Sequence, residues 1–262
     1  MATVIHPPSF IARVEGEFDL DARHTYFALR TAAGLIALLL PLVLVRWGLW
    51  HRVNWDAMGS LSAFYWLSLT PPLLDANALL RTWFVGSLIA VGVCLIIYRG
   101  YGNLEDWLLN CAGLAAILVA FNPMQWPQSN GPNPVPSAPP HADPLHVHPI
   151  AAITFFLLIA ATIWFCARDT LTAVSKPAIR ALWTSIYGVF AVAMVLIPLI
   201  TYVRIEKSHQ TLGVEWAGVW VFSLYWFFKT YELSRVSMVE PPSGPRPRVR
   251  RVRGKLEIIR QE

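Results

Sequence analysis

Long apolar runs, separated by short polar segments, dominate the pattern of this chain. A helix needs about 20 mainly apolar residues to cross a bilayer. Six runs reach or approach that length, and tryptophan and tyrosine, which prefer the headgroup layer, stand near many of their ends. We therefore predict an all-α fold, a polytopic membrane helix bundle, with transmembrane helices at about 28–50, 82–98, 107–121, 149–167, 181–203 and 214–233.

The composition supports a membrane protein. The chain is 55% hydrophobic and 14% charged, whereas soluble domains carry roughly 25% charged residues. Its mean hydropathy is +0.47, and so many apolar residues do not fit into one soluble core beneath a wettable surface. The three cysteines all lie inside apolar runs and show no disulfide framework or cysteine-based metal motif.

Segments of different character flank the predicted bundle, 28–233. Residues 1–27 are polar and of mixed charge, and the first apolar run begins too late for a signal peptide. We expect the first helix to remain in the mature protein. Residues 234–262 form a basic tail.

Lysine and arginine predict the orientation. With a cytoplasmic N-terminus, 16 of the 21 basic residues fall on the cytoplasmic side and five fall outside. This bias follows the positive-inside rule, and an even number of spans then places both termini in the cytoplasm. We expect a bacterial inner membrane protein.

Two outer loops are long. Residues 51–81 include "MGSLSAFYWLSLTPPLLDA", which is too apolar for a free loop and too interrupted to span. We predict that about 55–75 lie in the membrane interface or re-enter the membrane. Residues 122–149 contain nine prolines, which favour extended structure.

A group of histidines is the first candidate site. The stretch "HADPLHVH" (141–148) places two histidines two residues apart, so their side chains share a side if the segment is extended. The hypothesis is a zinc-type site whose ligands come from His146, His148, His209, Asp143 and Glu215. The alternatives are a solvated loop and a pH sensor.

A second candidate is an outer polar cluster. Glu215 begins the sixth predicted helix, where it either favours the helix dipole or pairs with Arg46, Arg81 or a histidine. Pro149 suits a first helical position, which places His148 at the N-cap. We expect His148 to form a hydrogen-bond tether to Glu215 or to the Ser62 segment. As an alternative, Ser62 could act as a nucleophile if His148 is its base.

The tail is a candidate surface for anionic lipid headgroups. Its basic residues beside a cytoplasmic membrane end are typical of such binding or of a topology anchor. No aromatic residues alternate with the arginines, so we expect no nucleic acid partner. The predicted headgroup residues are Arg246, Arg248, Arg250, Arg251, Arg253 and Lys255.

Several motifs resemble a family of uncharacterised bacterial multi-pass membrane proteins. These motifs are Ser62, "FVG" at 84–86, "YRGY" at 98–101, "NLEDW" with "NCAGLAA" through 116, and "HPIAA" at 148–152. The resemblance implies the fold. Ser62, His146, His148 and His209 also give a distant similarity to the alkaline ceramidase and adiponectin-receptor superfamily, whose seven-helix members hold zinc with a serine, an aspartate and three histidines. This chain has six predicted helices and no H-x-x-x-H in the last one.

Three classes of function are consistent with these patterns. The favoured class is a non-enzymatic scaffold, partner subunit or lipid-responsive module in the bilayer, alone, with a membrane protein partner or as a homo-oligomer. The alternative is a zinc-dependent lipid hydrolase at the outer leaflet. A small-solute transporter is third, because the predicted helices lack buried charges and paired broken segments.

Overall fold

The computed structural model describes residues 10–50, 59–67, 78–100, 102–124, 146–173, 176–236, 248–252 and 255–259. The long helices are α1 (Phe10–Trp50), α3 (Ala78–Ile97), α4 (Asn103–Phe121), α5 (Val147–Cys166), α6 (Pro177–Arg204) and α7 (Gln210–Val236). Short helices are α2 (Phe64–Leu67), η2 (Asp169–Ala173) and η3 (Lys207–His209). A hairpin pairs β1 (Arg248–Val252) with β2 (Lys255–Ile259), antiparallel.

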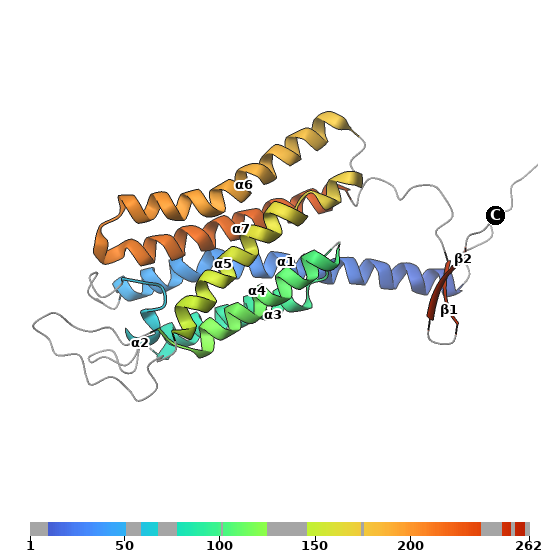
Figure 1. Ribbon diagram of the computed structural model, residues 1–262. Coiled ribbons are helices and arrows are strands. Elements are labelled where there is room, and N and C mark those ends of the chain that lie inside the picture. The colour runs from blue at the N-terminus through green and yellow to red at the C-terminus, as the bar shows by residue number, and fades with distance from the viewer. Residues whose placement is uncertain are drawn as a thin grey trace, which may run out of the picture.

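The long helices form one closed bundle. From α3 to α7, each packs against the next in chain order, while α1 packs against both α3 and α7 and so closes the ring. The N-terminal turns of α1 extend past the other helices (Figure 1). The short connections from α3 to α4 and from α6 to α7 favour antiparallel neighbours in these two pairs.

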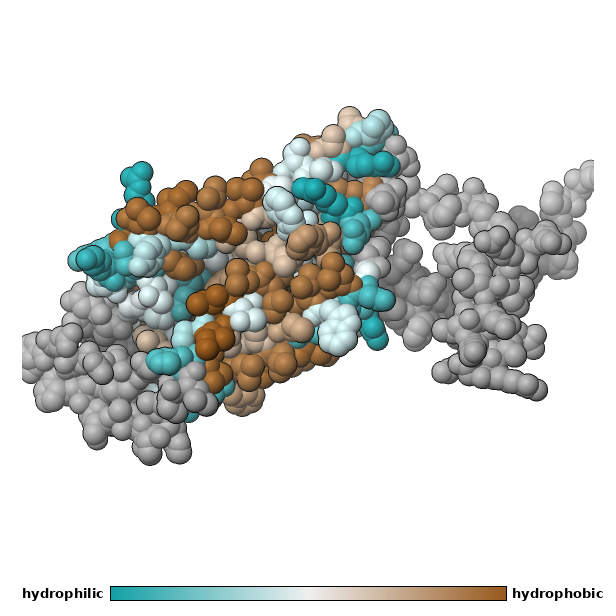
Figure 2. All heavy atoms as spheres, in the orientation of Figure 1, coloured by the Kyte–Doolittle hydropathy of each residue, from teal (hydrophilic) through white to brown (hydrophobic). Residues whose placement is uncertain are grey.

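Five of the helices contain segments long and apolar enough to cross a membrane, namely His24–Trp50, Leu79–Ile97, Asn103–Phe121, Val147–Leu171 and Pro177–Arg204. Many large apolar side chains on these helices stay exposed. They form a hydrophobic band that lies between more hydrophilic ends (Figure 2). A soluble protein does not present such a band to water, so the apolar helices indicate a membrane protein.

The helix α7 differs from these five in composition. Its 27 residues are long enough to span, but they include tryptophans, tyrosines and charged residues that lower its hydropathy. It packs between α1 and α6 and buries Phe222, Tyr225 and Trp226 in the main hydrophobic core. Ser223, Lys229 and Glu232 of the same helix are buried as well, so these polar residues face protein.

The helix ends lie within four residues of the predicted spans, apart from the start of α1. That helix begins at Phe10, 18 residues before the apolar run at 28. An apolar run marks only the part of a helix that contacts the core or lipid. Polar turns satisfy their backbone hydrogen bonds equally well and extend the helix beyond it.

The described part of the first long loop is covered by protein. Leu61 and Phe64 are buried in a hydrophobic cluster with Leu80 and Phe84 of α3. The indole of Trp66 donates a 2.8 Å hydrogen bond to the backbone oxygen of Met124. Residues 59–67 thus pack on the end of the bundle, while the rest of the predicted 55–75 segment lies outside the described residues.

Candidate functional site

One polar cluster joins three parts of the chain that are distant in sequence. We call Ser60, Ser62, His148 and Glu215 the serine cluster. The two serines precede α2, His148 lies in the first turn of α5, and Glu215 lies in the second turn of α7. Both serines and the histidine are buried. The structure therefore brings together Ser62, His148 and Glu215, three members of the predicted outer polar cluster.

The Glu215 carboxylate receives three hydrogen bonds from the segment before α2. Its Oε2 accepts from Ser60 Oγ at 2.8 Å and from the backbone nitrogen of Leu61 at 2.7 Å. Its Oε1 accepts from Ser62 Oγ at 3.2 Å. A partly buried carboxylate is stable when donors surround it in this way, so Glu215 fastens the segment to α7.

His148 fastens the same segment to α4 and α5. Its Nδ1 lies 2.7 Å from the backbone oxygen of Asn122, and its Nε2 lies 2.8 Å from Ser62 Oγ. A carbonyl oxygen only accepts, so Nδ1 carries a hydrogen. Ser62 has one hydroxyl hydrogen, which it donates either to Glu215 or to His148 Nε2.

The local backbone around His148 differs from the prediction. The N-cap of α5 is His146, with φ of 52°, and not His148. His148 and Pro149 lie in the second and third helical positions. Proline fits any position in the first turn of a helix, because the backbone nitrogens there have no intrahelical partner. The presence of Pro149 therefore did not determine at which residue α5 begins.

The predicted arginines do not join the serine cluster. Arg81 Nη2 lies 2.5 Å from the hydroxyl of Tyr65, and its guanidinium lies 4.2 Å from the centre of that ring. Arg46 lies 5.4 Å from the ring centre of Trp50. Aromatic faces attract arginine, and these contacts place both cations away from Glu215.

The ligands proposed for zinc are not assembled among the described residues, where no group of three or more histidine, cysteine, aspartate or glutamate side chains is placed to hold a metal ion. Both ring nitrogens of His148 are already hydrogen-bonded. His209 is also buried, with Nδ1 2.8 Å from Ser208 Oγ. Asp143 lies outside the described residues. Within the part of the chain that the structure describes, the proposed ligands therefore do not form a zinc site.

A second polar cluster lies near the other end of α7. We call Arg30, Glu105, Lys229 and Glu232 the charged cluster, and all four are buried. Lys229 follows Glu215 by 14 residues, which is about 21 Å along a helix. The expectation that the helices lack buried charges was therefore wrong. One argument against a small-solute transporter no longer applies.

Lys229 and Glu232 form a closely satisfied ion pair. Their charged atoms lie 2.9 Å apart, and both side chains are at most 1% exposed. Lys229 Nζ also donates to the backbone oxygen of Ala167, at 2.7 Å, and to Thr170 Oγ1. Glu232 accepts from Thr170 Oγ1 at 2.8 Å and from the hydroxyl of Tyr187. Each charge thus meets several partners, as burial requires.

Arg30 is enclosed by aromatic rings. Its guanidinium lies 4.7 Å from the ring centre of Trp226 and 4.9 Å from that of Tyr98. It donates to the hydroxyl of Tyr98 and, at 3.2 Å, to Thr230 Oγ1. Cation–π attraction and these hydrogen bonds replace part of the water that burial removes, while Arg30 Nη2 is buried without a hydrogen-bond partner. Arg30 therefore links α1 to α3 and α7.

The sequence did contain a signal for the charged cluster. Lys229 and Glu232 stand three residues apart inside the predicted sixth span, so they share one helix face. Arg30 likewise falls inside the first span. Ionisable residues within a span usually face the bundle interior and a partner. Both basic residues had been counted with the cytoplasmic charges that flank the spans, and that concealed the pairing.

The basic tail is described only in part. Arg248, Arg250 and Arg251 lie in β1, and Lys255 lies in β2. Arg250 pairs in register with Glu257 across the hairpin. Arg246 and Arg253 lie outside the described residues.

The two clusters have one property in common: within them, most polar groups that could react are already bonded to other groups of the chain. The arrangement can fasten loops and helices to one another. No family model matches this chain, and neither a curated protein nor a solved structure is significantly similar to it.

Proposed function

We propose that this chain is a non-enzymatic multi-pass membrane protein, a scaffold or partner subunit. One observation carries the proposal. In the serine cluster, the single carboxylate Glu215 binds both serine hydroxyls and the Leu61 backbone nitrogen of one segment. The cluster thereby holds the residues before α2 in a fixed position on the end of the bundle. A surface that binds a partner requires such a constant shape.

The same contacts disfavour hydrolysis. A serine nucleophile needs nearby hydrogen-bond donors, such as a backbone nitrogen, for the oxyanion that forms on its substrate. The Leu61 nitrogen, which could serve in that way, already donates to Glu215. The negative carboxylate beside Ser62 would also repel a developing oxyanion. Ser62 is therefore better suited to tethering than to attack.

The tether predicts a stability effect. Ser62→Ala removes one partner each from His148 and Glu215, so we expect the free energy of unfolding to fall by about 1–3 kcal/mol. Equilibrium unfolding of the purified chain in mixed detergent measures it. Ser185→Ala is the matched control, since that exposed hydroxyl bonds only within α6, to Ala181. An equal effect of both substitutions would contradict the tether.

The alternative function, a lipid hydrolase, is favoured by one contact, the 2.8 Å approach of His148 Nε2 to Ser62 Oγ. A fluorophosphonate probe, which reacts with activated serine hydroxyls, separates the two functions. We expect no modification of Ser62 in the intact protein. Modification of Ser62 that His148→Gln abolishes would favour the hydrolase.

We further propose six spans, with α7 as the sixth, in a bacterial inner membrane with both termini in the cytoplasm. The distribution of basic residues supports this orientation, because 14 of them lie on the cytoplasmic side even without Arg30 and Lys229, which are buried in the bundle, against five outside. Reporter fusions after Ser137 and after Ser243 should then report opposite sides of the membrane. Two fusions that report the same side would show that the threading is different.

The basic tail is proposed to bind anionic headgroups on the cytoplasmic side. Truncation after Pro242 removes seven basic residues, each of which contributes about 1 kcal/mol when it lies near an anionic surface. Both chains are held in neutral-lipid nanodiscs. At low salt, the truncated chain should bind phosphatidylglycerol vesicles with much lower affinity than the full chain. The bundle should unfold at the same temperature. Unchanged vesicle binding by the truncated chain would refute this role.

A further inference from the structure

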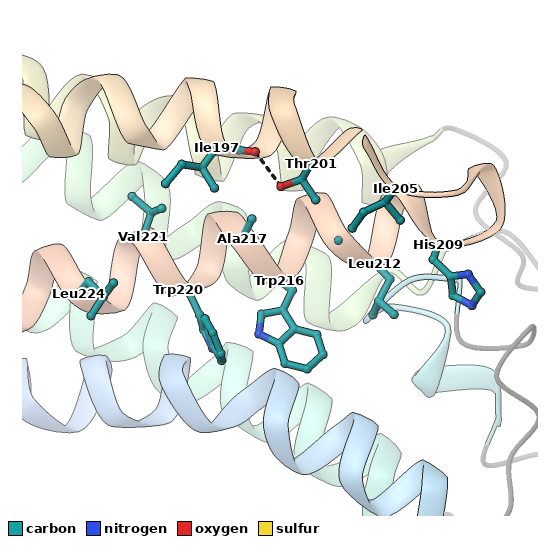
Figure 3. A pocket seen from close by; sticks show the side chains of 11 residues that line it. Ile197, Thr201, Ile205, His209, Leu212, Trp216, Ala217, Trp220, Val221 and Leu224 are labelled. Atoms are coloured by element: carbon teal, nitrogen blue, oxygen red, sulfur yellow. Dashed lines mark hydrogen bonds between the residues drawn. The ribbon is translucent and has the colours of Figure 1, made fainter. Parts of the chain in front are cut away.

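An apolar groove of about 440 Å³ runs between α6 and α7 near their connecting turn. Ligand pockets commonly measure roughly 300–1,000 Å³. Ile197 and Thr201 line the groove from α6, Ile205 lines it from the turn that follows, and Ala217 and Val221 line it from α7 (Figure 3). The hydroxyl of Thr201 donates to the backbone oxygen of Ile197 at 2.7 Å, so it does not offer its hydrogen to a ligand.

Small residues on α7 create the groove. At Gly213 a Cβ would lie only 2.5 Å from Ile205 Cδ1 and 2.7 Å from Thr201 Cγ2, so the two helices approach closely there. Ala217, one turn further along the same face, is too short to fill the space beside α6. Trp216 and Trp220 stack edge to face, with ring centres 5.5 Å apart, and form one wall.

The groove opens toward the membrane. Ile197, Ile205 and Leu224, which line it, are all exposed on the apolar surface of the bundle. In a bilayer, lipid acyl chains surround that surface. An acyl chain also matches a groove whose lining offers almost no unpaired polar group, because any polar ligand would lose its hydrogen bonds with water there.

One end of the groove is polar and basic. His209 lines that end, and the turn between Ile205 and His209 contains the exposed Lys207 beside Glu206. Arg204, the exposed last residue of α6, precedes Ile205 directly. Two basic side chains against one acidic side chain leave a net positive charge, which attracts an anionic headgroup.

We propose that this groove binds an anionic phospholipid, with one acyl chain between α6 and α7 and its phosphate beside Arg204 and Lys207. The site makes one lipid part of the bundle, on a face that does not include the serine cluster. It does not depend on the non-enzymatic role proposed above. It requires only that α6 and α7 lie in a bilayer.

Photo-crosslinking tests the position of the lipid directly. The full chain is reconstituted in nanodiscs of phosphatidylcholine and phosphatidylglycerol that contain a phosphatidylglycerol with a diazirine in its acyl chain. After illumination, mass spectrometry should find the label concentrated in peptides that contain 197–205 and 212–224. Label spread evenly over the lipid-facing sides of all helices would overturn the proposal.

Substitutions test the two halves of the site. Ala217→Phe should fill the groove and reduce the phosphatidylglycerol retained in native mass spectra by roughly tenfold. Val195→Phe adds the same ring on the exposed face of α6, outside the groove, and should leave retention unchanged. Full retention by Ala217→Phe would overturn the groove.

The charged residues at the end of the groove should determine which lipid headgroup it prefers. The pair Arg204→Gln and Lys207→Gln should reduce the preference for phosphatidylglycerol over phosphatidylcholine by roughly fivefold for each basic residue that the phosphate contacts. Glu206→Gln should increase that preference. A preference that neither change alters would overturn the headgroup site.

Discussion

Replacing Lys229 by methionine should lower the free energy of unfolding by about 3–5 kcal/mol, the largest effect that we expect from one substitution. The ammonium group is enclosed by α5, η2 and α7, and its removal leaves the buried Glu232 carboxylate without its counter-ion. Methionine fills similar space, so the loss reports the charge more than a cavity. Equilibrium unfolding in mixed detergent provides the measurement.

A double-mutant cycle provides the control for this result. Lys229→Met combined with Glu232→Leu removes both charges and should recover much of the stability that the single change loses. Lys176→Met, at an exposed lysine before α6, should change stability by less than about 0.5 kcal/mol. If the two buried substitutions were simply additive, the ion pair would not be the source of the effect.

Gly113→Ala should destabilise the protein by about 1–3 kcal/mol, because an added methyl group overfills the contact between α3 and α4. A Cβ at Gly113 would lie 2.5 Å from the backbone oxygen of Gly92, and a Cβ at Gly92 would lie 2.7 Å from that of Gly113. Backbone atoms cannot rotate away, so the two helices would have to separate. Thermal unfolding in detergent measures the loss.

Gly86→Ala is the matched control on α3. Nothing lies within 4 Å of a Cβ built at Gly86, so alanine meets no obstacle there. The substitution should be neutral or should stabilise the helix by about 0.5–1 kcal/mol, the ordinary advantage of alanine over glycine. Equal destabilisation at both positions would mean that helix propensity, and not close packing, controls the result.

The apolar pattern predicted the helices well because each run had to cover a core or lipid surface. Ala112, Ala116 and Ala120, spaced one turn apart on α4, are all buried, as close packing between helices requires. The early start of α1 was missed, since polar residues from Phe10 onward carry no apolar signal. The helices therefore followed from the length of the apolar runs, and their ends followed to within four residues except at the start of α1.

The serine cluster was partly predictable from sequence. Ser62, His148 and Glu215 stand beside helix ends that the predicted threading places on one side, and they meet. Which donor would satisfy Glu215 was not predictable, because Arg81 has a competing aromatic partner in Tyr65. Such choices depend on distances between side chains, which a pattern of apolar and polar positions does not contain.

The charged cluster on α7 has a consequence for biosynthesis. In the six-span topology proposed above, Lys229 and Glu232 oppose entry of α7 into the membrane alone; the cost of the lysine is below the value of about 2.5–3.5 kcal/mol that applies at the centre of a helix, because Lys229 lies nearer the end of α7. The groups that satisfy Lys229 and Glu232 come from Ala167, Thr170 and Tyr187, all synthesised earlier. In the proposed topology, the segments that carry these partners are therefore already in the membrane when α7 is inserted. The order of translation lets α7 insert beside the groups that bond Lys229 and Glu232.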